Sequence, residues 1–130
     1  MVIDDSRAMR MILKRIVTQL GFDVVEAGNG KEAMEYLESN VMNAEDVPPI
    51  LALVDWNMPE MNGLEFVTKV RDEPRLRGVT LMMVTTESEQ NQIVRALAAG
   101  AHEYVIKPFT PDAIVEKLAL LGLTSNGVAV

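Results

Sequence analysis

The segment ILALVDWNMP, residues 50–59, decides the fold because an unbroken apolar run ends in a carboxylate and a turn. A run of this length is typical of a strand that is buried on both faces of a sheet. Asp55 therefore stands at the carboxyl end of the strand, where α/β sheets place their functional groups. A second apolar run, residues 1–3, also ends in acids, Asp4 and Asp5. The repeated pattern predicts that three carboxylates share one site.

The carboxylates of Asp4, Asp5 and Asp55 predict a site for a divalent metal ion. Like charges within about 4 to 6 Å of one another repel, so the cluster requires a bound cation or a protonated member. Mg²⁺ prefers oxygen ligands and keeps coordination positions for water and phosphate oxygens. The alternative is that these acids are helix caps or solvated strand ends, since Asp5 precedes Ser6 at an expected helix start.

Composition limits the class of protein. The chain has 130 residues, a formal net charge of -7 and no cysteine. This length suits one domain, and the acidic charge argues against nucleic acid, whose binding needs clustered Lys and Arg. The absence of cysteine excludes disulfides and thiolate ligands. The apolar stretches are shorter than the roughly 18 residues of a membrane span and no signal segment is visible. We therefore expect no membrane insertion, a cytoplasmic location and a monomer.

Apolar residues at helical spacing predict five helices. Capping residues mark several of the starts, and Gly or Pro ends several of the runs. The fourth helix is marked by Ile93, Leu97 and Ala98 and ends at Gly100. The expected helices begin near Ser6, Asn29, Gly63, Glu87 and Thr110.

Five strands alternate with these helices, at residues 1–3, 22–27, 50–54, 79–84 and 101–106. The two most apolar strands are expected at the centre of the sheet, and the second strand, which carries charges, at an edge. Strict alternation predicts an α/β fold of the doubly wound, flavodoxin-like (βα)5 type, with a parallel sheet of strand order 2-1-3-4-5. We assign residues 1–130 to this one domain, with a loop at 41–49 and a frayed tail at 123–130.

An aspartate beside a bound metal can act as a nucleophile toward phosphorus. Formation of an aspartyl phosphate requires the metal and a cationic side chain to neutralise the phosphoryl oxygens. Lys107, at the end of the fifth strand, supplies the cation, and Thr85, at the end of the fourth, supplies a hydroxyl donor. Taken alone, Lys107 fits a surface lysine and Thr85 a strand-end hydroxyl or a helix N-cap. Their joint placement favours a phosphoryl site.

The chain resembles a response-regulator receiver domain over nearly its whole length. Trp56 directly after the acceptor Asp55, and Glu87 two positions after Thr85, are most similar to the stand-alone receivers of chemotaxis. The resemblance is carried by Asp4-Asp5, Asp55-Trp56-Asn57-Met58-Pro59, Gly63, Val84-Thr85, Tyr104 and Lys107-Pro108-Phe109.

This resemblance implies a phosphorylation-dependent signalling switch without an output domain, and not an enzyme that acts on a separate substrate. Asp55 would accept a phosphoryl group from a histidine kinase. Mg²⁺ would be held by Asp5, Asp55 and the backbone carbonyl of Asn57, with Asp4 acting through water. The family also implies a cis peptide bond before Pro108.

The resemblance further implies how the signal is passed on. Lys107 and Thr85 would bind the phosphoryl oxygens, and movement of Thr85 would allow Tyr104 to turn inward. That change would remodel the face formed by the fourth helix, fifth strand and fifth helix, where a downstream protein would bind. Asn57 and Glu87 would tune the self-catalysed loss of the phosphoryl group. For Tyr104 alone, ordinary packing on an amphipathic edge strand is the alternative.

Three other functions stay open at this point. Haloacid-dehalogenase-like hydrolases also form an aspartyl phosphate, but they use a second Asp two positions later, where this chain has Asn57. An interaction module that works without phosphorylation would not need the acid cluster. An intermediate of a phosphorelay would pass the phosphoryl group to another histidine and would hydrolyse it slowly.

Overall fold

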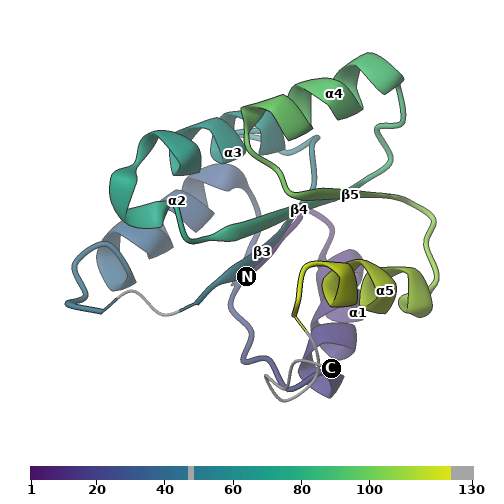
Figure 1. The fold of residues 1–130 in the computed structure, drawn as a ribbon, viewed down its shortest axis with the longest axis horizontal. Coiled ribbons are helices and arrows are strands. Elements are labelled where there is room, and N and C mark those ends of the chain that lie inside the picture. Colours follow the sequence, from purple (N-terminus) through teal and green to yellow (C-terminus); the bar gives the residue numbers. More distant parts are fainter. Residues whose placement is uncertain (47–48, 124–130) are drawn as a thin grey trace.

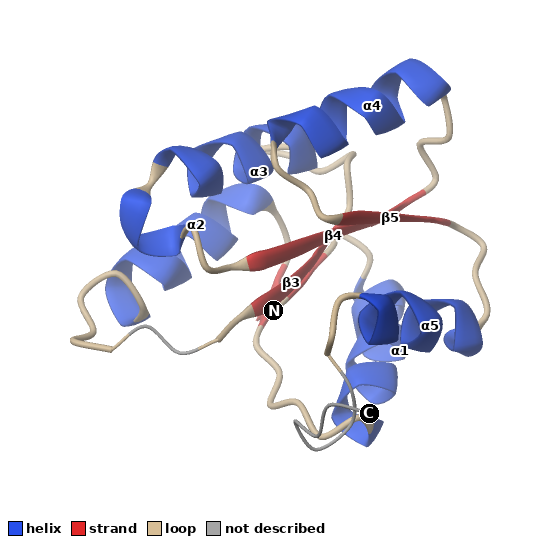
Figure 2. Ribbon diagram, viewed as in Figure 1, coloured by secondary structure: helices blue, strands red, loops and turns tan. Residues whose placement is uncertain are grey.

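The computed structural model describes residues 1–46 and 49–123, so the predicted frayed tail lies outside the described residues except for Leu123. Strands and helices alternate along this part of the chain, as Figures 1 and 2 show. The elements are β1 (Val2–Ile3), α1 (Arg7–Gln19), β2 (Glu26–Ala27), α2 (Gly30–Asn40), β3 (Leu51–Val54), α3 (Gly63–Asp72), the 3-10 turn η1 (Pro74–Leu76), β4 (Thr80–Thr85), α4 (Gln90–Ala99), β5 (Glu103–Ile106) and α5 (Pro111–Leu120).

The five strands form one parallel sheet of order β2-β1-β3-β4-β5, which confirms the predicted fold class and strand order. Helices α1 and α5 cover one face of the sheet, and α2, α3 and α4 cover the other (Figure 1). Ile3 lies opposite Val54 in the register of β1 and β3. The next residues, Asp4 and Asp55, therefore leave the sheet side by side.

The second strand is much shorter than predicted, because it covers only Glu26–Ala27 of residues 22–27. It pairs with β1 alone, and β1 itself has two residues, so the ladder between them cannot be longer. Its place at the edge of the sheet is as predicted.

The predicted helix starts are confirmed at four of five positions. The side chains of Ser6, Asn29 and Thr110 each accept a hydrogen bond from a backbone N–H in the first turn of their helices. Helix α3 begins at Gly63 as predicted, and Asn62 and Glu65 form a capping box at its start.

Helix α4 differs from the prediction. It begins at Gln90 instead of near Glu87, and its N-cap makes no side-chain hydrogen bond. Its fully buried residue is Ala96, whereas Leu97 is 42% exposed. Small Ala96 lets the helix approach the core of the α2, α3 and α4 side closely, which rotates the larger residues Val94 and Leu97 outward.

Two hydrophobic clusters hold the sheet between its helical layers. One contains Phe66 and Leu37 beneath α2, α3 and α4, and the other contains Leu13 and Leu118 beneath α1 and α5. Full burial of such side chains contributes about 1.5 to 3 kcal/mol each. The peptide bond between Lys107 and Pro108 is cis, as the resemblance implied. None of the helices among the described residues is both long and apolar enough to span a membrane.

Candidate functional site

The carboxyl ends of the central strands bring the three predicted acids together. One carboxylate oxygen each from Asp4, Asp5 and Asp55 lies within 4.8 Å of the others. Asp4 and Asp55 are buried, whereas Asp5 is exposed. The shared edge follows from the register of β1 and β3, since Asp4 and Asp55 directly follow the last paired residues and Asp5 is one residue further along the chain.

Lys107 lies between the two buried carboxylates. Its Nζ is 2.7 Å from Asp4 Oδ2 and 3.3 Å from Asp55 Oδ2, and its side chain is 11% exposed. The backbone N–H of Lys107 donates to the Thr85 carbonyl at 2.8 Å, which anchors the residue beyond β5 to the end of β4. Burial raises the pKa of the Asp4 carboxyl, and the hydrogen bond from Lys107 acts in the opposite direction.

Asp55 has both carboxylate oxygens engaged. Oδ1 accepts from the Trp56 backbone N–H at 2.7 Å, and Oδ2 faces the Lys107 ammonium. Trp56 itself is buried, and its carbonyl accepts from the Gly63 N–H at 2.8 Å. A Cβ at Gly63 would lie 2.2 Å from the Asp55 carbonyl oxygen. The sequence predicts a helix start at Gly63, and the structure shows that glycine is needed there because two backbones approach closely.

Thr85 and Tyr104 are linked through Glu87. The Thr85 hydroxyl accepts from the Glu87 N–H at 3.3 Å, and the Tyr104 hydroxyl donates to the Glu87 carbonyl at 2.6 Å. Thr85 is fully buried and Tyr104 is 8% exposed. Burial, followed by the charges of Glu87 and Asp55, raises the pKa of Tyr104 to about 12. The hydroxyl is therefore a fixed donor at neutral pH.

Asn57 is exposed in the loop after β3, and Glu87 is partly buried in the loop after β4. Both lie on loops that leave the same edge of the sheet as the acids. The structure gives no side-chain hydrogen bond to Asn57 within residues 1–46 and 49–123.

Sequence reasoning missed Arg10, which lies on α1 and follows no strand end. Its Nη1 donates to the Asp4 carbonyl at 2.7 Å and its Nε to Glu26 Oε1 at 3.3 Å. No sequence signal singles it out, because only the structure shows that Arg10 is partly buried whereas the neighbouring Arg7, Lys14 and Arg15 are exposed.

The acid cluster fits a bound Mg²⁺. Oxygen ligands about 2.1 Å from such an ion are at most about 4.2 Å apart, slightly less than the observed limit of 4.8 Å. Two carboxylates can thus bind directly while the third acts through water. In the described part of the chain Asp5 forms no ion pair, so its carboxylate is free to bind.

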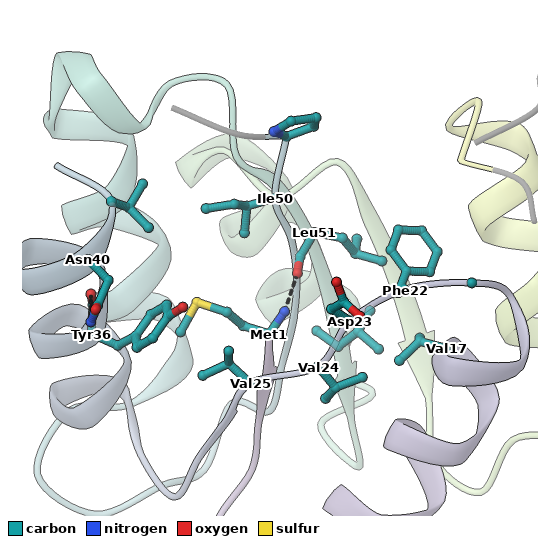
Figure 3. Close-up of a pocket in the computed structure, with 14 residues that line it drawn as sticks. Met1, Val17, Phe22, Asp23, Val24, Val25, Tyr36, Asn40, Ile50 and Leu51 are labelled. Atoms are coloured by element: carbon teal, nitrogen blue, oxygen red, sulfur yellow. Dashed lines mark hydrogen bonds between the residues drawn. The ribbon is translucent and has the colours of Figure 1, made fainter. Parts of the chain in front are cut away.

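A hollow of about 410 Å³ lies at the opposite, amino-terminal edge of the sheet, as Figure 3 shows. Val17, Phe22, Tyr36 and Ile50 are among the residues that line it, and the Met1 amino group donates to the Leu51 carbonyl there. None of the acids of the cluster lines this hollow. The polar groups that suit phosphoryl chemistry therefore lie at the other edge.

Comparisons with known proteins agree with this geometry. The response regulator receiver domain family matches residues 1–119. The chemotaxis protein CheY homolog of Campylobacter jejuni is 48% identical over 128 residues, covering 98% of this chain and 94% of that protein. Chemotaxis protein CheY1 of Helicobacter pylori is 43% identical over 122 residues, covering 93% and 94%. The solved structure of Vibrio cholerae chemotaxis protein CheY4 has a TM-score of 0.76 and 29% identity, and the match covers 90% of this chain and 92% of that one.

These matches extend over nearly the whole chain and agree with the motifs that the sequence displays. Homology to CheY proteins is consistent with a phosphorylation-dependent switch of two-component signalling in chemotaxis. The chain belongs to the response regulator receiver domain family.

Proposed function

We propose that this chain is a signalling switch in which Asp55 accepts a phosphoryl group from the phosphohistidine of a histidine kinase. The observation that carries the proposal is the position of Asp55, with an acid cluster on one side and the Lys107 ammonium at 3.3 Å. An Asp55 carboxylate oxygen would form the bond to phosphorus while the P–N bond breaks, and the imidazole nitrogen would keep the electron pair.

Asp5, Asp55 and the Asn57 carbonyl would hold Mg²⁺, with Asp4 acting through water. When bound, the ion would neutralise charge on the phosphoryl oxygens during transfer. The three carboxylates and one ammonium of the site carry a formal charge of about -2, so a divalent cation balances the cluster.

Lys107 and Thr85 would bind the transferred phosphoryl group. The Lys107 ammonium already touches an Asp55 oxygen and would turn onto a phosphoryl oxygen. The Thr85 hydroxyl accepts from the Glu87 N–H, which leaves its own hydrogen to donate. Both contacts would add charge-assisted or neutral hydrogen bonds that exist only after phosphorylation.

The conformational change would pass from Thr85 through Glu87 to Tyr104. Movement of the Thr85 hydroxyl toward the phosphoryl group would break its bond with the Glu87 N–H, and the Glu87 carbonyl holds the Tyr104 hydroxyl. Tyr104 already lies inside in this structure. The rearranged segment would therefore be the loop between β4 and α4, residues 86–89, and not the ring alone.

The output surface would be the face formed by α4, β5 and α5. Large apolar side chains are exposed on each of these elements, a pattern that suits binding to another protein. They are Val94, Leu97, Ile106 and Val115. The relatives are named chemotaxis proteins, so a downstream chemotaxis protein is the partner that we propose.

Asn57 and Glu87 would set the lifetime of the phosphorylated state, because they lie two residues beyond Asp55 and Thr85, where they would orient or hinder an attacking water. We expect Asn57→Ala and Glu87→Ala to change the phosphoryl half-life. Unchanged half-lives in both variants would contradict this role. A long half-life in the parent protein would favour a phosphorelay intermediate.

The fluorescence of Trp56 tests the proposal, since this buried indole follows the acceptor directly. We expect a saturable change on addition of Mg²⁺ and a further change with beryllofluoride, a mimic of the aspartyl phosphate. The second change should vanish in Asp55→Asn. A folded protein that responds to neither ligand would contradict the proposed function and favour an interaction module that works without phosphorylation.

A further inference from the structure

Arg10, on α1, links the backbone of the acid cluster to the edge strand β2. Its Nη1 lies 2.7 Å from the Asp4 carbonyl oxygen, and its Nε lies 3.3 Å from Glu26 Oε1. The Arg10 side chain is 19% exposed, which places the guanidinium against the protein and not in bulk water.

The carbonyl that Arg10 binds belongs to the peptide between Asp4 and Asp5. That peptide lies one residue beyond the end of β1, so no strand ladder holds its oxygen. Among the described residues, Arg10 is the one hydrogen-bond donor to this oxygen. The Asp4 N–H and Oδ1 are fixed separately, by Ala27 and Ser6. Arg10 therefore completes the fixation of the backbone from which both carboxylates project.

The planar guanidinium suits this task because it can direct separate N–H groups at two acceptors in a fixed geometry. Lys14 provides a natural comparison. It approaches the same Glu26 at 3.6 Å, but it is 52% exposed and makes no contact with Asp4. The two basic residues thus share the ion-pair partner and differ in the contact with the Asp4 backbone.

We propose that Arg10 is a positioning residue of the cation site: held by Glu26, it orients the Asp4–Asp5 peptide so that the two carboxylates face a bound divalent cation. This inference rests on the proposed function, which supplies the Mg²⁺ site. Removal of a residue that orients metal ligands typically weakens metal affinity by about 10- to 100-fold.

The positive charge of Arg10 and its positioning role predict opposite effects of its removal on Mg²⁺ affinity. Removal of a cationic side chain near a cation site, if charge alone mattered, would strengthen Mg²⁺ binding. A role in folding stability alone would leave the affinity of the folded protein unchanged. A positioning role predicts weaker binding despite the more negative site.

The test is Mg²⁺ binding measured by isothermal titration calorimetry on the full chain, with circular dichroism and urea unfolding as checks of the fold. We expect Arg10→Ala to weaken Mg²⁺ binding about tenfold. Arg10→Lys should recover little of this loss, because an ammonium lacks the fork that bridges both acceptors. Glu26→Gln should weaken binding by a smaller factor. Lys14→Ala, the matched control, should bind Mg²⁺ as the parent chain does.

Mg²⁺ affinity in folded Arg10→Ala equal to or tighter than that of the parent chain would overturn the proposal. An equal loss in Lys14→Ala would also overturn it, since Lys14 does not touch Asp4. If Arg10→Ala does not fold, Arg10→Lys decides: parental Mg²⁺ affinity in that variant would overturn the proposal, because the guanidinium fork would then not be needed. Failure of the parent chain to bind Mg²⁺ would instead contradict the proposed function, so the two failures are distinguishable.

Discussion

The two edges of the same sheet differ in the kind of concave surface that they form. At the carboxyl-terminal edge, buried Asp4 and Asp55 share the Lys107 ammonium, and Arg10 and Thr85 stand behind them. At the amino-terminal edge, a hollow of about 410 Å³ is lined by many apolar residues together with the polar Asp23, Tyr36 and Asn40 (Figure 3). The volume of a hollow therefore does not indicate where the functional site of this fold lies. The site is indicated by charged groups that converge at the carboxyl ends of parallel strands.

The largest expected effect comes from removal of the cation at the carboxyl-terminal edge. Lys107→Ala would leave two buried carboxylates without their shared ammonium and the phosphoryl group without a cationic partner. We expect the rate of Asp55 phosphorylation by a small-molecule phosphodonor to fall about a hundredfold or more. The measurement is the initial rate of phosphoprotein formation.

Lys117→Ala is the matched control, because Lys117 pairs with Glu103 on β5 and is much more exposed. It should leave the rate within about twofold of the parent value, since an exposed ion pair contributes little. Equal losses in both variants would show that the charge of the whole molecule, and not the local cluster, controls the reaction.

The next effect concerns the close backbone approach beside the acceptor. In Gly63→Ala the added Cβ would meet the Asp55 carbonyl oxygen at 2.2 Å, so the loop must shift. We expect a loss of about 3 kcal/mol in the free energy of unfolding and a slower phosphorylation rate. Gly78→Ala is the control, because a Cβ there meets nothing within 4 Å. Comparable urea midpoints for the two variants would contradict this explanation.

A substitution at the amino-terminal edge should separate stability from reactivity. Tyr36 lines the hollow and is partly buried, so Tyr36→Ala should lower the free energy of unfolding by about 2 kcal/mol. The phosphorylation rate of the folded variant should stay within about twofold of the parent rate. A large loss of rate would mean that the two edges are coupled, and would contradict the view that only the carboxyl-terminal edge supports phosphorylation.

The smallest expected effect is a dependence of folding stability on pH. It arises from His102, which lies just before β5 at the amino-terminal edge. Its Nδ1 accepts from the Leu81 N–H at 3.1 Å, and Arg71 lies 3.2 Å from the same nitrogen. Burial, followed by the Arg71 charge, lowers the pKa of His102 below 6.5. The unfolded chain thus binds this proton more readily, so stability is full above about pH 6.5 and declines as the pH falls through the lowered pKa.

The check is the difference in urea midpoint between the parent chain and His102→Asn as a function of pH. The difference matters because Asp4, whose pKa burial raises, favours the folded state toward acidic pH and so acts in the opposite direction. We expect the parent chain to lose its advantage over the variant on acidification. A difference that is constant between pH 7 and pH 5 would contradict the contact-based explanation.

Much of the fold was predictable from the sequence because strand ends and helix caps are local signals. Asp4 and Asp55 follow apolar runs directly, and alternation of elements then brings the strand ends to one edge. Caps such as Ser6 and Asn29 depend on side chains that bond within three residues, so their positions could be predicted from the sequence.

The rest depends on distances between segments, which the sequence does not display. Arg10 reaches Asp4 and Glu26 only after α1 packs beside β2, and the need for glycine at position 63 appears only when α3 meets the end of β3. The outward position of Leu97 likewise follows from the packing of Ala96, and the inward position of Tyr104 goes with its hydrogen bond to the Glu87 carbonyl. No local pattern distinguishes these cases.

The most direct test of the central claim is the intact mass of the chain after incubation with acetyl phosphate, with and without Mg²⁺, for the parent protein and Asp55→Asn. The account predicts a gain of one phosphoryl group that requires Mg²⁺ and is absent in Asp55→Asn. No gain in the folded parent protein, or an equal gain in Asp55→Asn, would contradict it.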